Sequence, residues 1–372
     1  MERQKTTLSA QKHILIAPLD WGLGHATRCM PLIQYLIQHN HHLHIAGNGD
    51  SLLYLKDAFP TLTFHELPGY NITYSVGKNA AFHVLLQTPK IWKAIRDEHQ
   101  AVANIVSRVN IDLIISDNRY GVRHDKVKSI FICHQIALQS PRPFQFMNAF
   151  FLQWHLQQIE KFDELWIPDE ANENNLSGSL SHGIEFKIPH SYIGIQSRYS
   201  NFIKQTSFID NIDFSILIVL SGVEPQRTYL ENKLIQVFKQ TNEKVLLVQG
   251  KTIAFTQSTI DKISIVSYLN SNDLFAAFQK AKSIICRSGY STIMDLAAIG
   301  KKAILIPAQG QTEQEYLAAS LANKGFAVYC KQDKLDIENA LEKLNNINGF
   351  PSNITIQNPN FENVINTALR NI

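Results

Sequence analysis

The sequence has little of several features that would place a protein in a special class. Its four cysteines, Cys29, Cys133, Cys286 and Cys330, form no CxxC pair and no Cys/His metal spacing, which favours reduced thiols in a cytoplasmic protein. No apolar run approaches the roughly 20 residues that a membrane-spanning helix needs. Residues 1–12 are polar and lack the apolar stretch of a signal peptide. We therefore expect a protein that is not integral to a membrane.

An excess of charge of one sign is also missing. The chain has 35 Lys and Arg residues and 32 Asp and Glu residues, which gives a formal net charge of +3. No dense basic block occurs, so no nucleic acid partner is expected. The mild positive charge is compatible with an anionic ligand or with loose attachment to an anionic membrane surface.

Short apolar runs alternate with amphipathic segments of helix length along the whole chain. The runs are residues 13–17, 43–46, 62–66, 112–116, 129–133, 164–167, 215–221, 244–249, 263–266, 283–286, 303–306 and 327–330. Such short, continuous runs are typical of strands buried on both faces of a parallel sheet, and the alternation indicates right-handed α/β units. Because 372 residues exceed one ordinary core, the sequence predicts an α/β protein with two doubly wound, Rossmann-like domains.

A polar stretch without a strand pattern separates the two halves. The expected parts are an N-terminal domain over residues 1–195, a linker over 196–213, a second domain over 214–357 and a C-terminal helix over 358–372. The apolar residues of that last helix could pack on either domain, including back on the first.

The loop after the first predicted strand combines two glycines with a histidine. Gly22 and Gly24 allow a close backbone approach, and free amides at the following helix start can hold an anion. His25 could take a proton from a hydroxyl group, because its pKa lies near working pH. A glycine turn with a capping histidine is the alternative. Arg28, one turn on, is either a structural anchor or an anion contact.

A second loop, residues 287–295, follows the strand at 283–286. Its serines, glycine and threonine offer hydroxyls, amides and a positive helix end to a diphosphate. Asp295 lies about one turn into the helix, where it could accept hydrogen bonds from ribose hydroxyls. A capping box formed by Thr292 and Asp295 fits the same spacing and can coexist with ligand binding.

A third loop, residues 307–316, follows the strand at 303–306 and is rich in glutamine. Its side chains could reach sugar hydroxyls at the carboxyl end of the strand, although a solvated loop explains the same composition.

Together these loops resemble the inverting glycosyltransferases of the GT-B fold. They are most similar to the group with the bacterial transferase that adds N-acetylglucosamine to a lipid-linked peptidoglycan precursor. Residues 22–25 resemble a shortened GxGGH turn, and residues 287–295 resemble the group's RSG…T…E segment with Asp295 in place of Glu. Gln314 and Glu315 before an aromatic residue resemble its QQ pair. Residues 221–227 depart from the usual GGSxG loop, which suggests a distinct subgroup.

The resemblance implies two Rossmann-like domains that face a cleft. It implies a nucleoside diphosphate sugar, with UDP expected, as co-substrate and no other cofactor. The sugar, a hexose or N-acetylhexosamine, would pass with inversion to a cell-envelope glycan or a lipid-linked acceptor. The expected donor-binding residues are Gly22, Gly24, Ser221, Gly222, Arg227, Arg287, Ser288, Gly289, Ser291, Thr292, Asp295, Gln309, Gln311, Gln314 and Glu315. The expected acceptor-side residues are Arg28, Asp117, Arg119 and His134.

The chemistry needs a base for the acceptor hydroxyl and a stabilised leaving group. We assign the first role to His25 and the second to the helix start at 288–292, helped by Arg227 or Arg287. The sequence contains no Asp-x-Asp, the metal motif of many glycosyltransferases with the other main fold, and we expect no metal. The histidines within residues 39–44 are interpreted as a solvated loop rather than a metal site.

Two segments, residues 80–95 and 143–154, combine aromatic and apolar residues, and the first of them also has basic residues within and beside it. Most of these residues should pack on a sheet, and the remainder would suit peripheral contact with the cytoplasmic face of a membrane. Three other functions stay open: a nucleotide-sugar hydrolase, which can share the GxGHxxR turn, an epimerase of the same fold, and a non-catalytic nucleotide-sugar sensor.

Overall fold

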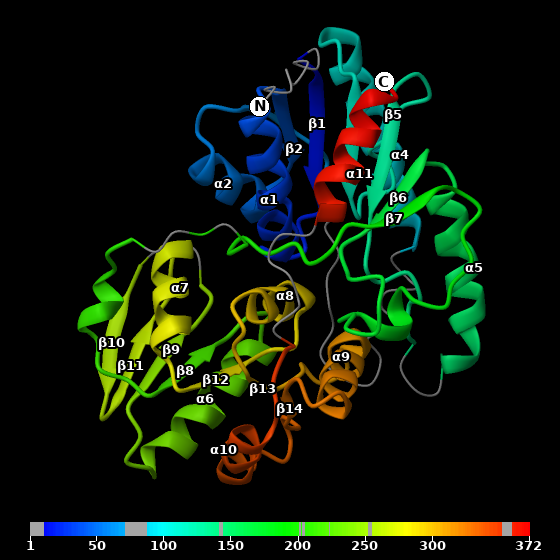
Figure 1. Cartoon of the computed structure of the whole chain (residues 1–372). Helices are drawn as coiled ribbons and strands as arrows, with labels where there is room; N and C mark the ends of the chain where they lie inside the picture. Colours follow the sequence, from blue (N-terminus) through cyan, green and yellow to red (C-terminus); the bar gives the residue numbers. More distant parts are fainter. Residues whose placement is uncertain are drawn as a thin grey trace, which may run out of the picture.

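The computed structural model describes residues 11–70, 88–140, 144–200, 202, 205–222, 224–251, 255–351 and 359–372. Within these ranges the chain forms two seven-stranded sheets, each covered by helices on both faces (Figure 1). The predicted class, α/β with two doubly wound domains, is confirmed.

The first domain is built on a parallel sheet. Its strands follow the order β3-β2-β1-β4-β5-β6-β7. They are β1 (His13–Pro18), β2 (His42–Gly47), β3 (Thr63–Glu66), β4 (Leu113–Asp117), β5 (Lys128–Ile132), β6 (Glu164–Ile167) and β7 (His190–Tyr192). The helices are α1 (Gly24–Gln38), α2 (Gly49–Ala58), α4 (Thr88–Arg108) and α5 (Asn148–Ile159), with short 3-10 turns at Phe144–Met147 and Gly178–Leu180.

The second domain has the order β10-β11-β9-β8-β12-β13-β14, with only β10 antiparallel to its neighbour among the described strands. Its strands are β8 (Ile216–Val219), β9 (Val245–Val248), β10 (Gln257–Ile260), β11 (Ile263–Val266), β12 (Ser283–Cys286), β13 (Ile304–Leu305) and β14 (Val328–Tyr329). Its helices are α6 (Gln226–Lys239), α7 (Ser271–Lys280), α8 (Tyr290–Ala298), α9 (Thr312–Asn323) and α10 (Ile337–Asn346), after a 3-10 turn at Phe208–Asn211.

The sequence pattern missed two strands, β7 and β10. Both lie at the edge of a sheet and are mostly exposed or half-buried, so neither carries the continuous apolar run by which a central strand is recognised. The other strands lie on the predicted runs, and all of them except the edge strand β3, which is exposed or half-buried, are mostly buried.

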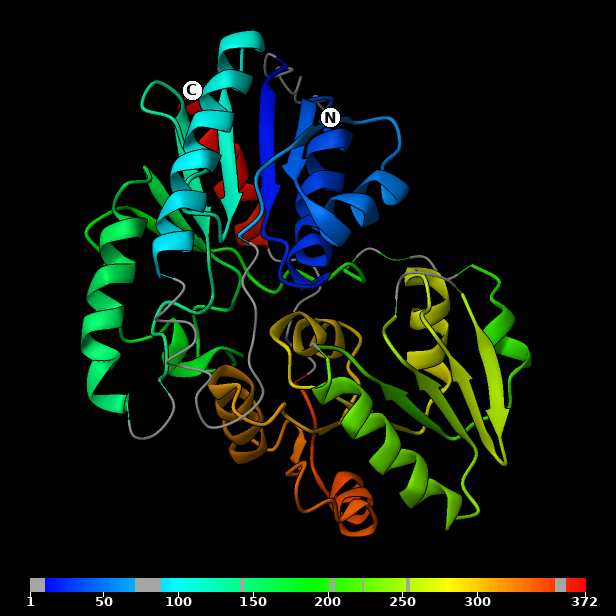
Figure 2. The same cartoon turned by 180° about the vertical axis from the view of Figure 1, so that it is seen from behind.

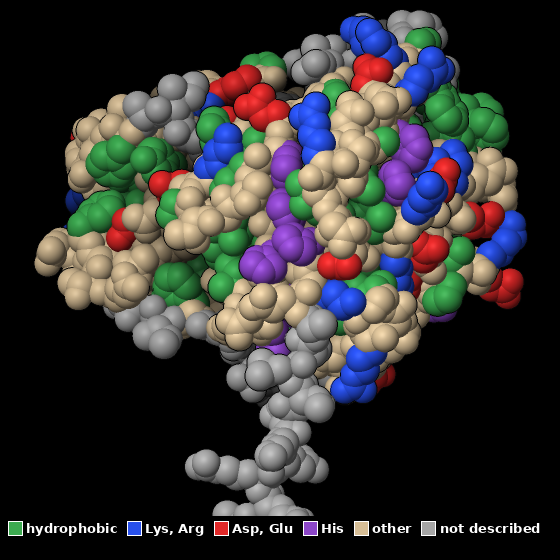
Figure 3. Space-filling model, turned by 90° about the horizontal axis from the view of Figure 1, so that it is seen from above, with side chains coloured by type: hydrophobic (Ala, Val, Ile, Leu, Met, Phe, Trp, Pro, Cys, Tyr) green, Lys and Arg blue, Asp and Glu red, His purple; other side chains and the backbone are tan. Residues whose placement is uncertain are grey.

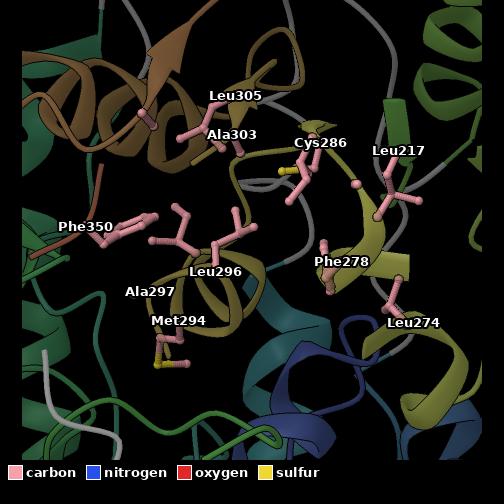
Figure 4. Close-up of a cluster of buried hydrophobic side chains, with 14 of the residues drawn as sticks. Leu217, Leu274, Phe278, Cys286, Met294, Leu296, Ala297, Ala303, Leu305 and Phe350 are labelled. Carbon is pink, nitrogen blue, oxygen red and sulfur yellow. The ribbon is translucent and has the colours of Figure 1, made fainter. Parts of the chain in front are cut away.

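The core of the second domain fixes α8 firmly on its sheet. Side chains from β8, α7, β12, α8 and β13 meet in one cluster, in which Phe278, Met294 and Leu305 are almost completely buried (Figure 4). Burying a side chain of this size contributes about 1.5–3 kcal/mol. The start of α8, which matters for the site, is therefore held in place by the packing of its own buried face.

The last helix of the chain, α11 (Pro359–Arg370), returns to the first domain. Ile365, Ala368 and Leu369 join the core beneath α1, and the Tyr35 hydroxyl donates to the Asn366 side chain at 3.2 Å. α1 and α11 cover one face of the first sheet and α4 covers the other (Figures 1 and 2). Residues 352–358 lie outside the described residues.

The prediction of a solvated histidine loop is wrong for His41 and His44, which are 7% and 8% exposed. β2 begins at His42 and turns His44 toward His13 on β1 and His65 on β3, with nitrogen–nitrogen distances of 3.2 Å on each side. Seen from the end of the molecule that lies away from the second domain, histidine side chains form a row on the surface (Figure 3). Among the described residues, no group of three or more His, Cys, Asp or Glu has the arrangement of a metal site.

Candidate active site between the two domains

The start of α1 lies at the carboxyl edge of the first sheet. The glycine turn brings the chain there: Gly22 has φ +80°, a left-handed conformation that favours glycine. A Cβ on Gly24 would lie 2.8 Å from the Ser291 hydroxyl oxygen, so this glycine lets α1 approach the second domain. β1 and β4 are neighbours in the sheet, and the end of β4 therefore faces the first turn of α1.

His25, Arg28 and Asp117 form one buried cluster. The His25 Nδ1 atom lies 2.9 Å from Asp117 Oδ1, and Arg28 Nε donates to Asp117 Oδ2 at 2.6 Å. A second guanidinium nitrogen of Arg28 pairs with Asp117 Oδ1, so the ion pair is bidentate. Burial alone would raise the pKa of Asp117, but Arg28 and His25 outweigh it and hold the pKa well below its ordinary value. Asp117 is therefore an anion across the physiological range.

These contacts prepare His25 to accept a proton. Burial and then Arg28 lower its pKa, whereas Asp117 opposes them, so the imidazole is neutral at neutral pH. His25 Nδ1 lies 2.9 Å from both Asp117 Oδ1 and Arg28 NH2. In the tautomer whose Nδ1 hydrogen is donated to the Asp117 carboxylate, Nε2 is left with its lone pair. A base with a buried carboxylate behind it is stabilised when it becomes charged. The His25 side chain is 13% exposed, and the Asp117 side chain is not exposed at all.

The cluster continues to a residue of the second domain. Arg28 NH1 lies 2.9 Å from His134 Nδ1, and His134 Nε2 lies 2.8 Å from Glu313 Oε1. The His134 ring stacks on Tyr290, with 3.9 Å between centroids and 5° between planes. Residues from α1, the ends of β4 and β5, α8 and α9 thus meet at the domain interface.

Two helix starts touch beside His25. The Ser291 hydroxyl, on α8, donates to the Gly24 carbonyl at 2.9 Å. The N-cap residues are Leu23 for α1 and Gly289 for α8, and neither makes a side-chain capping hydrogen bond. The first amides of a helix carry a partial positive charge, which favours negative charge beside these two starts.

The second domain matches a known family. Residues 218–366 match the model of the glycosyltransferase family 28 C-terminal domain. Among curated proteins, the UDP-N-acetylglucosamine--N-acetylmuramyl-(pentapeptide) pyrophosphoryl-undecaprenol N-acetylglucosamine transferase of Alkaliphilus oremlandii is 30% identical over 150 residues. The match covers 37% of this chain and 40% of that protein, so the chain matches less than half of that relative's length. An uncharacterized glycosyltransferase of Methanosarcina mazei is 21% identical over 344 residues, 84% of each chain.

Solved structures extend the likeness to both domains. The glycosyltransferase SnogD from Streptomyces nogalater has a TM-score of 0.61 at 12% identity and covers 96% of this chain and 99% of its own. UGT89C1 of Arabidopsis thaliana, complexed with quercetin, has a TM-score of 0.63 at 12% identity, with 97% and 99% covered. The fold is GT-B. The resemblance to the peptidoglycan N-acetylglucosaminyltransferase group is confirmed, and the low identity and partial coverage are consistent with a distinct subgroup.

In this GT-B chain, Arg28, Asp117 and His134 lie together, but Arg119 lies elsewhere. The Arg119 guanidinium is completely buried inside the first domain and donates to Glu98 Oε1 at 2.8 Å and to the Pro68 carbonyl at 2.7 Å. The prediction that Arg119 faces the acceptor is therefore wrong. Its position follows from a buried carboxylate on α4 that the local sequence does not reveal.

Arg287 and Arg227 also turn away from the helix starts. Arg287 is 1% exposed and donates to the carbonyls of Ile306, Pro307 and Gln226. Burial lowers its pKa to about 10. Arg227 pairs with Glu224 and donates to the Gln249 carbonyl at 2.9 Å. The predicted help of either arginine to a leaving diphosphate is not supported, because both guanidinium groups already bind acceptors within the domain.

The predicted capping box is wrong. α8 begins at Tyr290 with Gly289 as its N-cap, which leaves Thr292 inside the first turn. Asp295 is 3% exposed, accepts from the Ser197 hydroxyl at 2.7 Å and pairs with Arg198 at 3.0 Å. Both of its oxygens are thus engaged by the linker, so the structure gives Asp295 an anchoring position and does not favour the predicted ribose contact.

The remaining donor-side residues line the edge at which β8, β12 and β13 end. Ser221 and Gly222 follow β8, and the Ser288 hydroxyl donates to the Gln314 carbonyl at 2.8 Å. Gln309, Gln311, Gln314 and Glu315 lie in or just after the loop between β13 and α9. Gln314 and Glu315 accept from the amides of Ala308 and Gly310, both at 3.0 Å, and so brace this loop.

Sequence reasoning missed Glu313 and Tyr290 as neighbours of the His25 cluster. Both residues belong to the loops it singled out, and both lie in the first turn of a helix. Their contacts with His134 connect the two domains, and no local pattern reports such a contact.

Proposed function

We propose that the protein transfers a sugar, a hexose or N-acetylhexosamine, from a nucleoside diphosphate sugar to a cell-envelope or lipid-linked acceptor, with inversion. UDP is the expected nucleotide. The observation that carries the proposal is the His25–Asp117 pair, 2.9 Å apart, beside the touching starts of α1 and α8. The family 28 match and the GT-B neighbours support nucleotide-sugar chemistry.

In this mechanism the acceptor hydroxyl approaches His25 Nε2. Its proton passes to Nε2 while its oxygen forms a bond to the anomeric carbon, on the side opposite the diphosphate. The bond from that carbon to the diphosphate oxygen breaks, and the leaving group takes the electron pair. Asp117 stabilises the imidazolium, and the amides at the start of α8 stabilise the diphosphate. Attack from the opposite side accounts for inversion.

Nucleotide preference is tested by melting the protein with UDP, dTDP, GDP and their sugars. A ligand at 100 times its Kd stabilises the folded state by about 2.7 kcal/mol, so the preferred nucleotide raises the Tm most. Failure of every nucleotide to raise the Tm would contradict donor binding. Release of free sugar at full rate without an acceptor would favour the hydrolase instead, whereas donor binding without turnover would favour the sensor.

The proposal assigns the leaving-group charge to helix amides and gives no role to a metal. Turnover in EDTA should equal turnover in magnesium. A loss of activity in EDTA that magnesium restores would contradict this assignment.

The acceptor assignment includes peripheral contact with the cytoplasmic face of a membrane. Phe146, in the 3-10 turn before α5, is 79% exposed, Phe150, in the first turn of α5, is 65% exposed, and Trp92 on α4 is 43% exposed. Exposed Lys90 and Lys93 lie on α4 beside Trp92. Residues 80–87 and 143, part of the segments singled out in the sequence, lie outside the described residues. No helix in the described ranges is long and apolar enough to span a bilayer.

The membrane contact predicts flotation with anionic vesicles but not with neutral ones. Replacing Phe146 and Phe150 by serine should abolish flotation, because aromatic side chains at an interface and basic residues beside them act together. The exposed pair Phe208 and Tyr229 in the second domain provides a control replacement of similar size. Equal flotation of the two variants would exclude this surface.

A further inference from the structure

Glu313 is the residue of the second domain that reaches the base cluster of the first. It is the second residue of α9, directly after the loop that carries Gln309 and Gln311. Its carboxylate lies 2.8 Å from His134 Nε2. His134 is 7% exposed, and its ring is held flat against Tyr290 of α8. The imidazole is therefore clamped between two helix starts of the second domain and the end of β5.

The hydrogen bonds that join Arg28, His134 and Glu313 have one consistent direction. A guanidinium group can only donate, so His134 Nδ1 accepts from Arg28 and His134 Nε2 must carry the hydrogen that Glu313 accepts. On its other side Arg28 donates to Asp117, and His25 Nδ1 lies 2.9 Å from both Asp117 Oδ1 and Arg28 NH2. Four consecutive contacts thus connect Glu313 to the base.

Uptake of one proton by His25 balances the charges of the cluster. Glu313 and Asp117 are anions and Arg28 is a cation, so the cluster carries one net negative charge while His25 and His134 are neutral. His25 and Arg28 are among the groups that lower the pKa of Glu313, although burial opposes them. By the same interaction, Glu313 favours the protonated form of His25.

We propose that Glu313 is a positioning residue, which couples contact between the domains to the working geometry of the His25 base. This inference rests on the proposed function, because it concerns the base of that reaction. Through His134, Glu313 fixes the orientation of Arg28, and Arg28 fixes the carboxylate that orients His25. Since Glu313 belongs to the domain that is expected to hold the donor, the base is complete only when that domain is docked.

Other titratable groups near the cluster could also affect the titration of His25. The thiols of Cys29 and Cys133 lie near Arg28, and Tyr290 packs on His134. Burial raises the pKa of both thiols, so they stay protonated in the range in which His25 titrates. A change in the His25 titration on replacing Glu313 therefore reports on Glu313.

The experiment compares two substitutions of Glu313 with a matched control. Glu313→Gln keeps an acceptor oxygen for His134 but removes the charge, and Glu313→Ala removes both. Thr312→Val is the control, because Thr312 Oγ1 makes a different interdomain bond, 2.6 Å to the Gln139 carbonyl, from the same helix start. The pH profile of kcat/KM and kcat itself are measured for each protein.

Glu313→Gln should move the acid limb of kcat/KM to lower pH by about 0.5 unit, because a negative charge near His25 is lost. Glu313→Ala should lower kcat about 10-fold with a smaller change in KM for the donor, the pattern of a lost transition-state contact. Thr312→Val should leave the acid limb in place. The proposal is wrong if both Glu313 variants match Thr312→Val in acid limb and kcat.

A second readout needs no substrate. Titration of the His25 imidazole by NMR in the ligand-free protein should show a lower pKa in Glu313→Gln than in Thr312→Val. Equal values would overturn the coupling even if the enzyme is active. If no donor is turned over at all, the proposed function fails, whereas this titration still decides the role of Glu313. Because Glu313→Gln changes little in size, a folded protein is expected for it.

Discussion

Asp117 and Arg119 lie two residues apart at the end of β4, and both are completely buried in ion pairs. In the described part of the chain, the side-chain partners of Arg119 all belong to the first domain: Glu98, Asn48 and the carbonyls of Pro18 and Pro68. A Cβ on Gly121 would lie 2.6 Å from the Glu98 Cβ, so the loop is closely packed there. This network therefore stays within the first domain.

The network of Asp117 instead ends at a partly exposed imidazole and crosses to the second domain. Its members are the same residue types, an arginine and a carboxylate, with histidines added. Burial and charge pairing therefore do not distinguish a framework from a reactive site. What distinguishes them is whether the network reaches a group that can exchange a proton with a ligand.

The largest effect should come from His25→Ala on the reactive side of this comparison. Loss of a general base typically costs 10²–10⁴-fold, and we expect kcat/KM to fall about 1,000-fold with little change in the free energy of unfolding. Steady-state kinetics and urea unfolding measure both quantities. His190→Ala, at an exposed histidine, should leave both unchanged. Full activity of His25→Ala would remove the base assignment.

On the framework side, Arg119→Met should destabilise the fold by about 3–5 kcal/mol, because it leaves the Glu98 carboxylate buried without its charge partner. Urea unfolding measures the loss. Adding Glu98→Gln should restore part of it, since a neutral amide is cheaper to bury. If Arg119→Met unfolds normally yet is inactive, Arg119 belongs to the reactive network after all.

Asp295→Asn tests whether a third buried carboxylate supports the fold, as the Arg119 network does, or the reaction, as we propose for the Asp117 network. Losing the charge that binds Arg198 and Ser197 should destabilise the protein by about 1–3 kcal/mol. We expect the Kd for UDP, measured by calorimetry, to change less than about 3-fold, under 0.7 kcal/mol. A large loss of affinity at unchanged stability would support the ribose contact predicted from the sequence.

The smallest effect concerns His44, which belongs to neither network. Burial, and then His65 and His13, lower its pKa to about 4, so the folded protein takes up this proton less readily than the unfolded chain. Its contribution to stability is complete above about pH 6.5 and is lost as the pH falls toward 4. After discounting for solvent screening, we expect a loss of about 1 kcal/mol. His44→Leu should unfold with a weaker pH dependence between these values, and an unchanged dependence would contradict the assignment.

The sequence alone predicted the central strands, the two-domain architecture and the loops that meet at the site. These follow from local chemistry, because a short continuous apolar run between turn signals is typical of a buried strand and a glycine turn before an amphipathic stretch marks a helix start. His25 was found because it follows such a turn. The edge strands β7 and β10 were missed because their residues are mostly exposed or half-buried and carry no such run.

The tertiary structure alone decided where each charged side chain points. The partners of Arg119, Arg287 and Asp295 include Glu98, Gln332 and Ser197, which lie 21, 45 and 98 residues away in the chain. A buried charge goes to whichever complementary group the fold brings near, since leaving it unpaired costs several kcal/mol. The sequence by itself determined that strands, turns and a histidine would gather at one edge of the sheet. Packing between distant residues determined which charged side chains lie beside that histidine and which are paired inside the fold.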